Sequence, residues 1–508
     1  MFEFIKKLED FYKPQVSPRK PCPKIPISKN LESNIIVLQS LFNNSSDLTI
    51  KKLTLNIDLK TIDIAVITME GLVDKEVLAA SVTNPISQFD KGFCFGRDVF
   101  EALEKDIITN CDHMAVNFIG EAASYIMSGF ACLLISGENK AIAVGVQGYA
   151  FRSVEEPQTE VLQRGSREGF VEPIKVNIGM LRRRLKNTNL KFETMTIGDV
   201  SQTDICLCYL NDTVSKDILR ELKNRISNVS VDTLLASGYL VSYLDETGSD
   251  SLFSGVGVTE RPDTACAKIC EGKILILVDG TPSALIVPYL MIENFQTLDD
   301  YSNRPYFATM TRWLKYIAFV ISILLPGLYV AFASYNPEFF PSQLLTKVAT
   351  SISKTPFSAF SEVFFFTFIY EVMREAGLRL PKTLGHAVTI IGGLVIGDTA
   401  VSSGFIGAPT LMIVALTVIC SYVIPNLYAS IAFLRMMFII IGGFFGVWGI
   451  ILFFCVLSVN ICSKESFGVP FMVPAAPIDL FGFRDFIVRA DWKVLSRRQI
   501  KVQDLIDE

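Results

Sequence analysis

One long stretch of the sequence, Gly385 to Val459, limits the possible folds more than any other. It carries only two formally charged side chains, Asp398 and Arg435. A soluble core seldom runs this far with so few charges, because a soluble fold keeps charged side chains along its surface. Residues 1–312 instead alternate polar and apolar segments. The sequence therefore predicts a soluble N-terminal region followed by an α-helical multi-span membrane domain.

The apolar runs of the second part set the expected number of membrane crossings. One helical crossing needs about 20 apolar residues. The run Pro356–Glu371 is shorter and is interrupted by Glu362, so we expect a short inserted helix there. Four crossings leave the basic C-terminal tail in the cytosol but put basic loops on the far side of the membrane, against the preference of basic residues for the cytosolic side. Five crossings reverse both assignments. We favour four crossings. The runs that are long enough to span are Trp313–Tyr335, His386–Ile406, Leu411–Tyr428 and Met436–Ser458.

The soluble part shows two successive cycles of strand, helix and hairpin patterns. The hairpins are "ACLLISGENKAIAVGV" and "GKILILVDGTPSALIVPY", because two apolar runs joined by a short turn sequence favour a β-hairpin. We therefore predict an α+β cytosolic N-terminal region of two subdomains. The predicted divisions are a mobile N-terminal arm over residues 1–55, subdomains over 56–160 and 161–312, the helical membrane domain over 313–462, and a cytosolic C-terminal tail over 463–508.

Composition excludes several classes of function. The net charge of −5 argues against a nucleic-acid partner. Only two histidines occur, which disfavours a histidine-based zinc site or a Ser-His-Asp triad. The sequence lacks a phosphate-binding loop motif and a nucleophile elbow, and its scattered cysteines are typical of small buried hydrophobes in a reducing compartment. We expect no enzyme, no metal and no cofactor.

Several peptide runs, taken together in order and spacing, resemble one protein family. They are "MEGLVDKEVL" (69–78), "RSVEEPQTEVLQRGSREGFVEP" (152–173), "NIGMLRRRL" (177–185), "TERPD" (259–263), "EGKILILVDGTPSALIVP" (271–288) and "REAGLRLPKTLG" (374–385). On these runs the chain resembles the A subunit of the GerA-type spore germinant receptors of endospore-forming bacteria. The resemblance extends from about residue 56 to about residue 490.

This resemblance implies a subunit in the inner membrane of the bacterial spore, with its N-terminal region in the cytosol. It implies a complex with a transporter-like B subunit, which receives the nutrient, and a lipoprotein C subunit. It further implies a homo-oligomer that forms an ion-conducting pore and opens when nutrient binds. The alternatives are a nutrient-independent spore paralogue acting as a channel or scaffold, and a small-solute transporter. The transporter is disfavoured because the sequence contains no second, related membrane half.

The small-residue segment 385–405 is the candidate pore or packing helix. Gly393 and Gly397 form a G-x-x-x-G pair, which lets helices approach closely. Asp398 lies near its middle, where an ionisable side chain is costly and normally faces a bundle interior or water. It either contributes to a cation-favouring ring in a pore or pairs with a neighbouring subunit's arginine or a backbone donor. The candidate residues are Gly392, Gly393, Gly397, Asp398, Thr399 and Ser403.

The stretch "EVMREAGLRLPKTLG" is expected to be the charged end of the short inserted helix. Glu371 and Arg374, and likewise Glu375 and Arg379, are spaced to pair if the helix continues that far. These four residues form either a collar that positions the pore helix or an interfacial anchor in membrane lipid. We expect Arg435, farther along, to extend towards the membrane interface.

The charged loop over residues 152–172 is the candidate coupling loop between subunits or domains. The alternative is a solvated connector, because exposed ion pairs contribute only about 0–1 kcal/mol each. We expect the neighbouring Arg182, Arg183 and Arg184 to lie on an exposed helix face. The candidate loop residues are Glu160, Arg164, Arg167 and Glu168.

Overall fold

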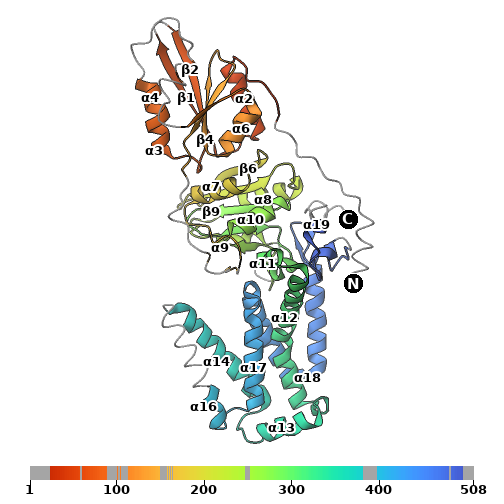
Figure 1. The fold of residues 1–508 in the computed structure, drawn as a ribbon. Helices are drawn as coiled ribbons and strands as arrows, with labels where there is room; N and C mark the ends of the chain where they lie inside the picture. Colours follow the sequence, from red (N-terminus) through yellow and green to blue (C-terminus); the bar gives the residue numbers. More distant parts are fainter. Residues whose placement is uncertain are drawn as a thin grey trace.

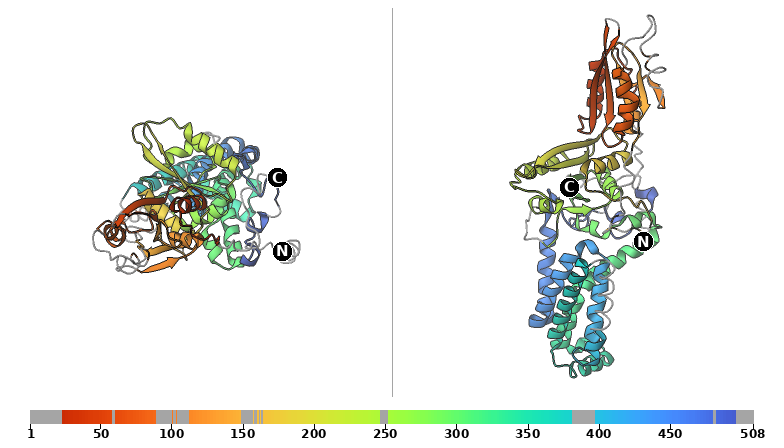
Figure 2. Two further views of the ribbon diagram at one scale, coloured as in Figure 1. Left: turned by 90° about the horizontal axis from the view of Figure 1, so that it is seen from above. Right: turned by 90° about the vertical axis from the view of Figure 1, so that its left-hand side faces the viewer.

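The computed structural model describes residues 23–57, 60–88, 112–148, 164–245, 252–380, 397–479 and 482–495, and the single residues Phe100, Leu103, Pro157, Glu160 and Leu162. Two soluble subdomains are stacked at one end of a helix bundle, and the C-terminal tail lies beside the second of them (Figure 1). A view from the side shows the same elongated arrangement (Figure 2).

Subdomain 1 has, within the described residues, a five-stranded antiparallel sheet in the order β1-β2-β4-β5-β3. Successive residues of β2 point to opposite faces: Ala65 and Ile67 pack under α2 and α6, while Ile64 and Val66 pack under η1 and α4. The elements are α2 (Leu31–Leu41), β1 (Leu48–Ile57), β2 (Lys60–Met69), α3 (Lys75–Leu78), η1 (Ala79–Thr83), α4 (Asn84–Gln88), β3 (His113–Val116), α6 (Ile119–Met127), β4 (Phe130–Ile135) and β5 (Ala141–Gly145).

Subdomain 2 repeats this strand order, as β6-β7-β9-β10-β8. Helices α7 and α10 cover one face of its sheet, and α8 and α9 cover the other. Both predicted hairpins are confirmed, as β4–β5 and β9–β10. The elements are α7 (Ile174–Arg184), β6 (Leu190–Ile197), β7 (Thr203–Leu210), α8 (Lys216–Ser227), α9 (Ser237–Leu244), β8 (Gly257–Thr259), α10 (Pro262–Cys270), β9 (Ile274–Val278) and β10 (Ala284–Val287).

Helix α7 joins the two subdomains. Gly179 lies so close to Gly71 that an added Cβ would be 2.7 Å from the Gly71 carbonyl oxygen. Arg182 is fully buried and donates from Nε to Asp47 Oδ2 at 2.9 Å. The prediction of three exposed arginines is therefore wrong: Arg182 links the subdomains, and Arg183 and Arg184 bind the carboxylate of Glu168.

The expected arm over residues 1–55 includes segments that are structured. Helix α2 begins at Leu31, and Asn30 caps it by accepting from the backbone N–H groups of Glu32 and Ser33. Strand β1 begins at Leu48, so a boundary at residue 55 cuts through the β1–β2 hairpin. The polar stretch before β1 is a turn between two core elements, because Leu38 and Phe42 are fully buried.

The second half of the chain consists mainly of helices. The chain leaves subdomain 2 through η4 and α11, and α12 then begins at Pro305, before the predicted domain boundary at residue 312. Pro326 lies inside α12 without ending it. The elements are η4 (Met291–Phe295), α11 (Leu298–Ser302), α12 (Pro305–Ser334), η5 (Pro337–Phe339), α13 (Ser342–Ile352), α14 (Ala359–Arg379), α16 (Gly397–Ser402), α17 (Ala408–Tyr422), η7 (Pro425–Leu427) and α18 (Tyr428–Ser463).

Helix α18 is two antiparallel helices joined at Gly446. That residue has φ 61° and ψ −154°, outside the helical range. The rings of Phe438 and Phe453 lie 4.9 Å apart, whereas fifteen residues of straight helix would separate them by about 22 Å. Ser430 and Lys464, near the two ends of α18, donate to the neighbouring carbonyls of Leu252 and Phe253. The chain therefore reverses direction within the predicted span Met436–Ser458, and that single-span prediction is wrong.

Two helices of the described residues, Pro305–Ser334 and Pro425–Ser463, are long and apolar enough to cross a membrane, and the second is this folded-back pair. The expected short insertion is a longer helix, α14, which continues through Gly377 to Arg379. A multi-span arrangement stays a prediction. The tail contains β11 (Glu465–Ser466), β12 (Val469–Pro470), η8 (Gly482–Asp485) and α19 (Trp492–Leu495).

Candidate coupling site between the soluble region and the helix bundle

The passage from subdomain 2 into the bundle is short and tightly capped. Thr297 and Asp300 form a capping box that starts α11, in which the Asp300 carboxylate accepts from the backbone N–H and the hydroxyl of Thr297. Only two residues, Asn303 and Arg304, separate α11 from α12, whose first residue is Pro305. The soluble region and the first long helix are thus joined without a flexible linker.

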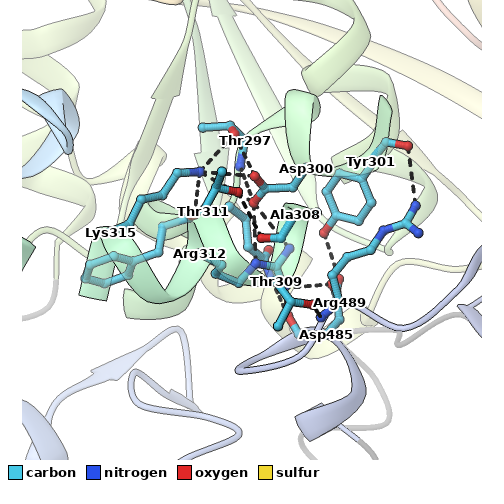
Figure 3. Close-up of polar contacts among 12 residues, drawn as sticks. Thr297, Asp300, Tyr301, Ala308, Thr309, Thr311, Arg312, Lys315, Asp485 and Arg489 are labelled. Carbon is cyan, nitrogen blue, oxygen red and sulfur yellow. Dashed lines mark hydrogen bonds and ion pairs between the residues drawn. The ribbon is translucent and has the colours of Figure 1, made fainter. Parts of the chain in front are cut away.

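Arg312, in the third turn of α12, is the centre of this joint. Its side chain is fully buried and contacts Asp300 Oδ2 at 3.3 Å and Asp485 Oδ1 at 3.0 Å. Nη1 also donates to the Asp485 carbonyl at 2.6 Å. One guanidinium therefore connects α11, α12 and the C-terminal tail, as Figure 3 shows.

A second cation of α12 reinforces the contact with α11. Lys315 Nζ lies 3.2 Å from Asp300 Oδ1, and it donates to Thr297 Oγ1 at 2.9 Å (Figure 3). Asp300 is buried. Its carboxylate is paired with the two cations, Arg312 and Lys315, and with the hydroxyl of Thr297 in the capping box. Because a buried charge is costly without partners, these groups fix the angle at which α12 leaves the soluble region.

The C-terminal tail closes the joint from the other side. Tyr301 OH donates to Asp485 Oδ2 at 2.7 Å, and Arg489 Nη2 donates to the Tyr301 carbonyl at 3.3 Å (Figure 3). Burial, and then the charge of Asp485, raises the pKa of Tyr301. The indole of Trp313 donates to the Ile487 carbonyl at 2.9 Å. The tail is therefore part of the joint rather than a free extension, within its described residues.

The candidate coupling loop contacts both subdomain 2 and the joint. Glu160 accepts from Thr259 Oγ1 at 2.7 Å, and the guanidinium of Arg261 donates to the carbonyl oxygens of Glu160 and Ser166. The backbone N–H of Arg164 donates to Asp299 Oδ1, in the first turn of α11, at 3.4 Å. The described residues of the loop thus lie between the β8–α10 turn and α11, and Arg167 belongs to the same segment.

The pKa values of the two loop carboxyls shift in opposite directions. Burial raises the pKa of Glu160 to about 7. The pKa of Glu168 is lowered, because its hydrogen bonds and ion pairs with Arg183 and Arg184 outweigh its partial burial. Glu168 is therefore an ionic anchor for α7, whereas Glu160 is a carboxyl that titrates near neutral pH.

The predicted collar pairs both form on α14. Arg374 Nε lies 3.2 Å from Glu371 Oε2, and Arg379 Nη2 lies 2.9 Å from Glu375 Oε1. Glu371 also accepts from Tyr428 OH at 3.0 Å and pairs with Arg435 of α18. The collar therefore connects α14 to the start of α18.

The sequence predicts that Arg435 extends towards the membrane interface, and this prediction is wrong. Its side chain is 1% exposed, and Nη2 binds Glu371. Side chains of a helix point towards its N-terminus, so Arg435 reaches back along α18 towards Tyr428 but remains inside the protein. A carboxylate on a neighbouring helix binds its Nη2, and single-sequence hydropathy cannot register such a partner.

The candidate pore residues are only partly within the described chain. Gly397 is buried at the start of α16, whereas Asp398, Thr399 and Ser403 are exposed, and Ser403 Oγ donates to the Thr399 carbonyl at 2.5 Å. Gly392 and Gly393 lie outside the described residues. The candidate helix is thus represented by its last turns, with its polar side chains on the surface of a single chain.

Sequence reasoning missed a buried carboxylate that ties α14 to α17. Glu362 is 1% exposed and accepts from Thr410 Oγ1 at 2.8 Å and from the Gly407 N–H at 3.3 Å. It thereby caps the N-terminus of α17, where the helix dipole favours a negative charge. Its position as the one charge interrupting an apolar run was the available signal.

Comparisons with known proteins point in one direction. The model of the Bacillus/Clostridium GerA spore germination protein family matches residues 37–500. Spore germination protein KA of Bacillus subtilis (strain 168) is 36% identical over 474 residues, 93% of this chain and 86% of that protein. Spore germination protein GerLA of Bacillus cereus is 35% identical over 375 residues, 73% and 76% of the two chains. A crystal structure of the N-terminal domain of the A subunit of the Bacillus megaterium spore germinant receptor GerK3 matches 53% of this chain and 98% of that one, with 26% identity and a TM-score of 0.41.

Proposed function

The chain belongs to the Bacillus/Clostridium GerA spore germination protein family, and we propose that it is the receptor subunit that couples nutrient sensing to ion release. A component of a germinant receptor is the assignment that its named relatives favour. The proposal adds that several copies assemble into a ligand-gated ion channel. It also places the chain as a multi-pass protein of the inner spore membrane, with its N-terminal region in the cytosol.

The observation that carries this proposal is the buried joint around Arg312. A linker of two residues and a guanidinium shared by Asp300 and Asp485 leave little freedom between subdomain 2 and α12. A displacement of the soluble region would therefore be transmitted to α12. The joint and the collar lie at the same end of the bundle, so α12, α14 and α18 would respond together.

The proposed partners are a transporter-like B subunit that receives the nutrient, a lipoprotein C subunit and further copies of this chain. The exposed side chains of Asp398 and Thr399 support the homo-oligomer. Polar groups at membrane depth normally face protein or water, and a ring of chains around α16 would supply either. We propose no catalytic activity.

Ion flux from vesicles tests the function. The chain is reconstituted with the proposed B and C subunits, and nutrient should release trapped monovalent cations. D398N should alter the cation selectivity or the conductance, whereas D217N, an equal change at an exposed site of α8, should not. Saturable solute uptake would instead indicate a transporter, and the absence of both effects a scaffold. Flux that ignores nutrient would indicate a nutrient-independent paralogue.

A further inference from the structure

The collar cluster lies at the end of the bundle that faces the soluble region. The collar cluster is a different set from the four collar residues predicted from the sequence, because it leaves out Glu375 and Arg379. Its members are Tyr370, Glu371 and Arg374 of α14, Tyr422 of α17, and Tyr428 and Arg435 of α18. Ser430, on the same part of α18, shows how close the cluster is to the soluble region, because its hydroxyl donates to the Leu252 carbonyl there. If the bundle spans a membrane, the cluster lies where lipid headgroups meet the hydrocarbon.

The described residues of the collar cluster include two arginines but only one carboxylate, which leaves one positive charge unbalanced. Arg374 and Arg435 share the single carboxylate of Glu371. Glu375 does not change this balance, because it pairs at 2.9 Å with Arg379 and approaches Arg374 only to 3.8 Å. A surplus cation beside hydrocarbon is costly unless an anion lies near it. Among the described residues, the cluster therefore has one positive charge that no carboxylate balances.

Donor groups of the cluster are also left over. The Nε and Nη1 groups of Arg435 are buried and have no hydrogen-bond partner among the described residues. The guanidinium of Arg374 lies 4.0 Å above the ring of Tyr428, and its side chain remains 27% exposed. The hydroxyls of Tyr370 and Tyr422 meet at 2.6 Å beside it. Arginine with tyrosine hydroxyls suits a phosphate oxyanion.

The surface next to the cluster is apolar, which distinguishes a lipid from a free anion. On α14, Phe365, Phe368 and Val372 are all more than half exposed and follow one another at helical spacing; Ile419 of α17 is 63% exposed. This surface begins at the cluster and continues along the bundle away from the soluble region. Acyl chains lie against such a surface, whereas inorganic phosphate gains nothing from it.

We propose that the collar cluster binds the phosphate of an anionic phospholipid headgroup in the leaflet nearest the soluble region. Arg374 contacts the phosphate directly. Arg435 lies behind it, and its positive charge attracts the phosphate without contacting it. The acyl chains lie along the exposed faces of α14 and α17. Because the lipid touches both α14 and the start of α18, the composition of that leaflet affects how firmly these helices are held.

Native mass spectrometry of the full-length protein, released from bilayers containing phosphatidylglycerol, tests this site. The wild type should retain phosphatidylglycerol in preference to phosphatidylcholine. R374Q should weaken retention about tenfold, the effect of losing one charge-assisted hydrogen bond. The matched control is R304Q, which removes the same charge from an exposed arginine at the start of α12, outside the cluster.

Each outcome of this experiment decides the proposal. Equal retention by R374Q and R304Q would mean that phosphatidylglycerol is held by general surface charge, which overturns the site. Displacement of the lipid by inorganic phosphate would assign a soluble anion instead. R374K guards against misfolding: if it melts like the wild type, its charge should restore part of the retention, and a failure to restore any would also count against the site.

Discussion

The carboxyl of Glu160 makes the stability of the soluble region depend on pH. Burial raises its pKa to about 7 from an ordinary value of 4.5, and the hydrogen bond from Thr259 and the charge of Arg261 offset only part of this rise. The folded chain therefore holds this proton more tightly than the unfolded chain. The stabilisation is complete below about pH 4.5 and is lost as the pH rises through about 7.

Thermal unfolding of the full-length protein at pH 5, 7 and 8 checks this expectation. E160Q keeps a neutral side chain at every pH, so its stability should fall less than that of the wild type between pH 5 and 8. The difference should amount to at most about 3 kcal/mol, since one pKa unit corresponds to about 1.4 kcal/mol. E32Q, at a carboxylate that is 61% exposed, should follow the wild type. Parallel curves for E160Q and the wild type would contradict the assignment.

Isolated charges were easy to find in the sequence, but their surroundings were not. Glu362 and Arg435 stood out as charges within apolar runs, and both lie inside the helix bundle, although Arg435 was expected at the membrane interface. Their partners, the N-terminus of α17 and Glu371, come from segments far away in the sequence. Spacing along one helix predicts local pairs, such as Glu375 with Arg379, but it carries no information about contacts between helices.

Among the elements, the reversal at Gly446 depends on a backbone conformation that favours glycine. Its φ of 61° lies in the left-handed range, and an added Cβ would lie 3.2 Å from the ring of Tyr335. G446A should therefore destabilise the folded protein by about 1–3 kcal/mol. G238A, in the helix α9, adds its Cβ into open space and should be neutral or slightly stabilising. Thermal unfolding in detergent compares the two variants, and equal melting temperatures would argue against a strained reversal.

Hydropathy missed this reversal for a physical reason. Both halves of α18 are apolar, so their sum reads as one continuous run. The sequence "GGFFG" over residues 442–446 was the available signal, because closely spaced glycines permit both a turn and close helix contact. Gly442 shows the second use: an added Cβ there would lie 2.5 Å from the carbonyl oxygen of Gly327 in α12.

Across the whole molecule, the α+β character and two-subdomain plan of the soluble region followed from sequence, whereas their common strand order did not. Alternation of apolar residues predicts strands and hairpins locally. The shared order β1-β2-β4-β5-β3 and β6-β7-β9-β10-β8 is a property of pairing between distant strands. Similar folds tolerate different core residues when volume and pattern are kept, so the two subdomains need not resemble each other in sequence.

The joint around Arg312 is where the two halves of the molecule act on each other, and a double-mutant cycle measures that action. R312Q leaves the buried Asp300 and the partly exposed Asp485 without this guanidinium, and such a loss typically costs about 3–5 kcal/mol. D485N alone should cost less, because Asp485 is 18% exposed. If the two residues interact as the structure has them, the double variant should lose less stability than the two single losses added together, by about 0.5–3 kcal/mol.

The same variants show whether the joint only stabilises the fold or also transmits movement from the soluble region to α12. Nutrient-dependent ion flux in reconstituted vesicles should fall in R312Q by more than its loss of folded protein accounts for, because α12 would no longer follow subdomain 2 rigidly. R220Q removes an arginine that is 73% exposed on α8 and should leave flux unchanged. Flux that falls only in proportion to folded protein would restrict Arg312 to holding the fold together, and movement would then be transmitted through other contacts, such as that of Arg164 with α11.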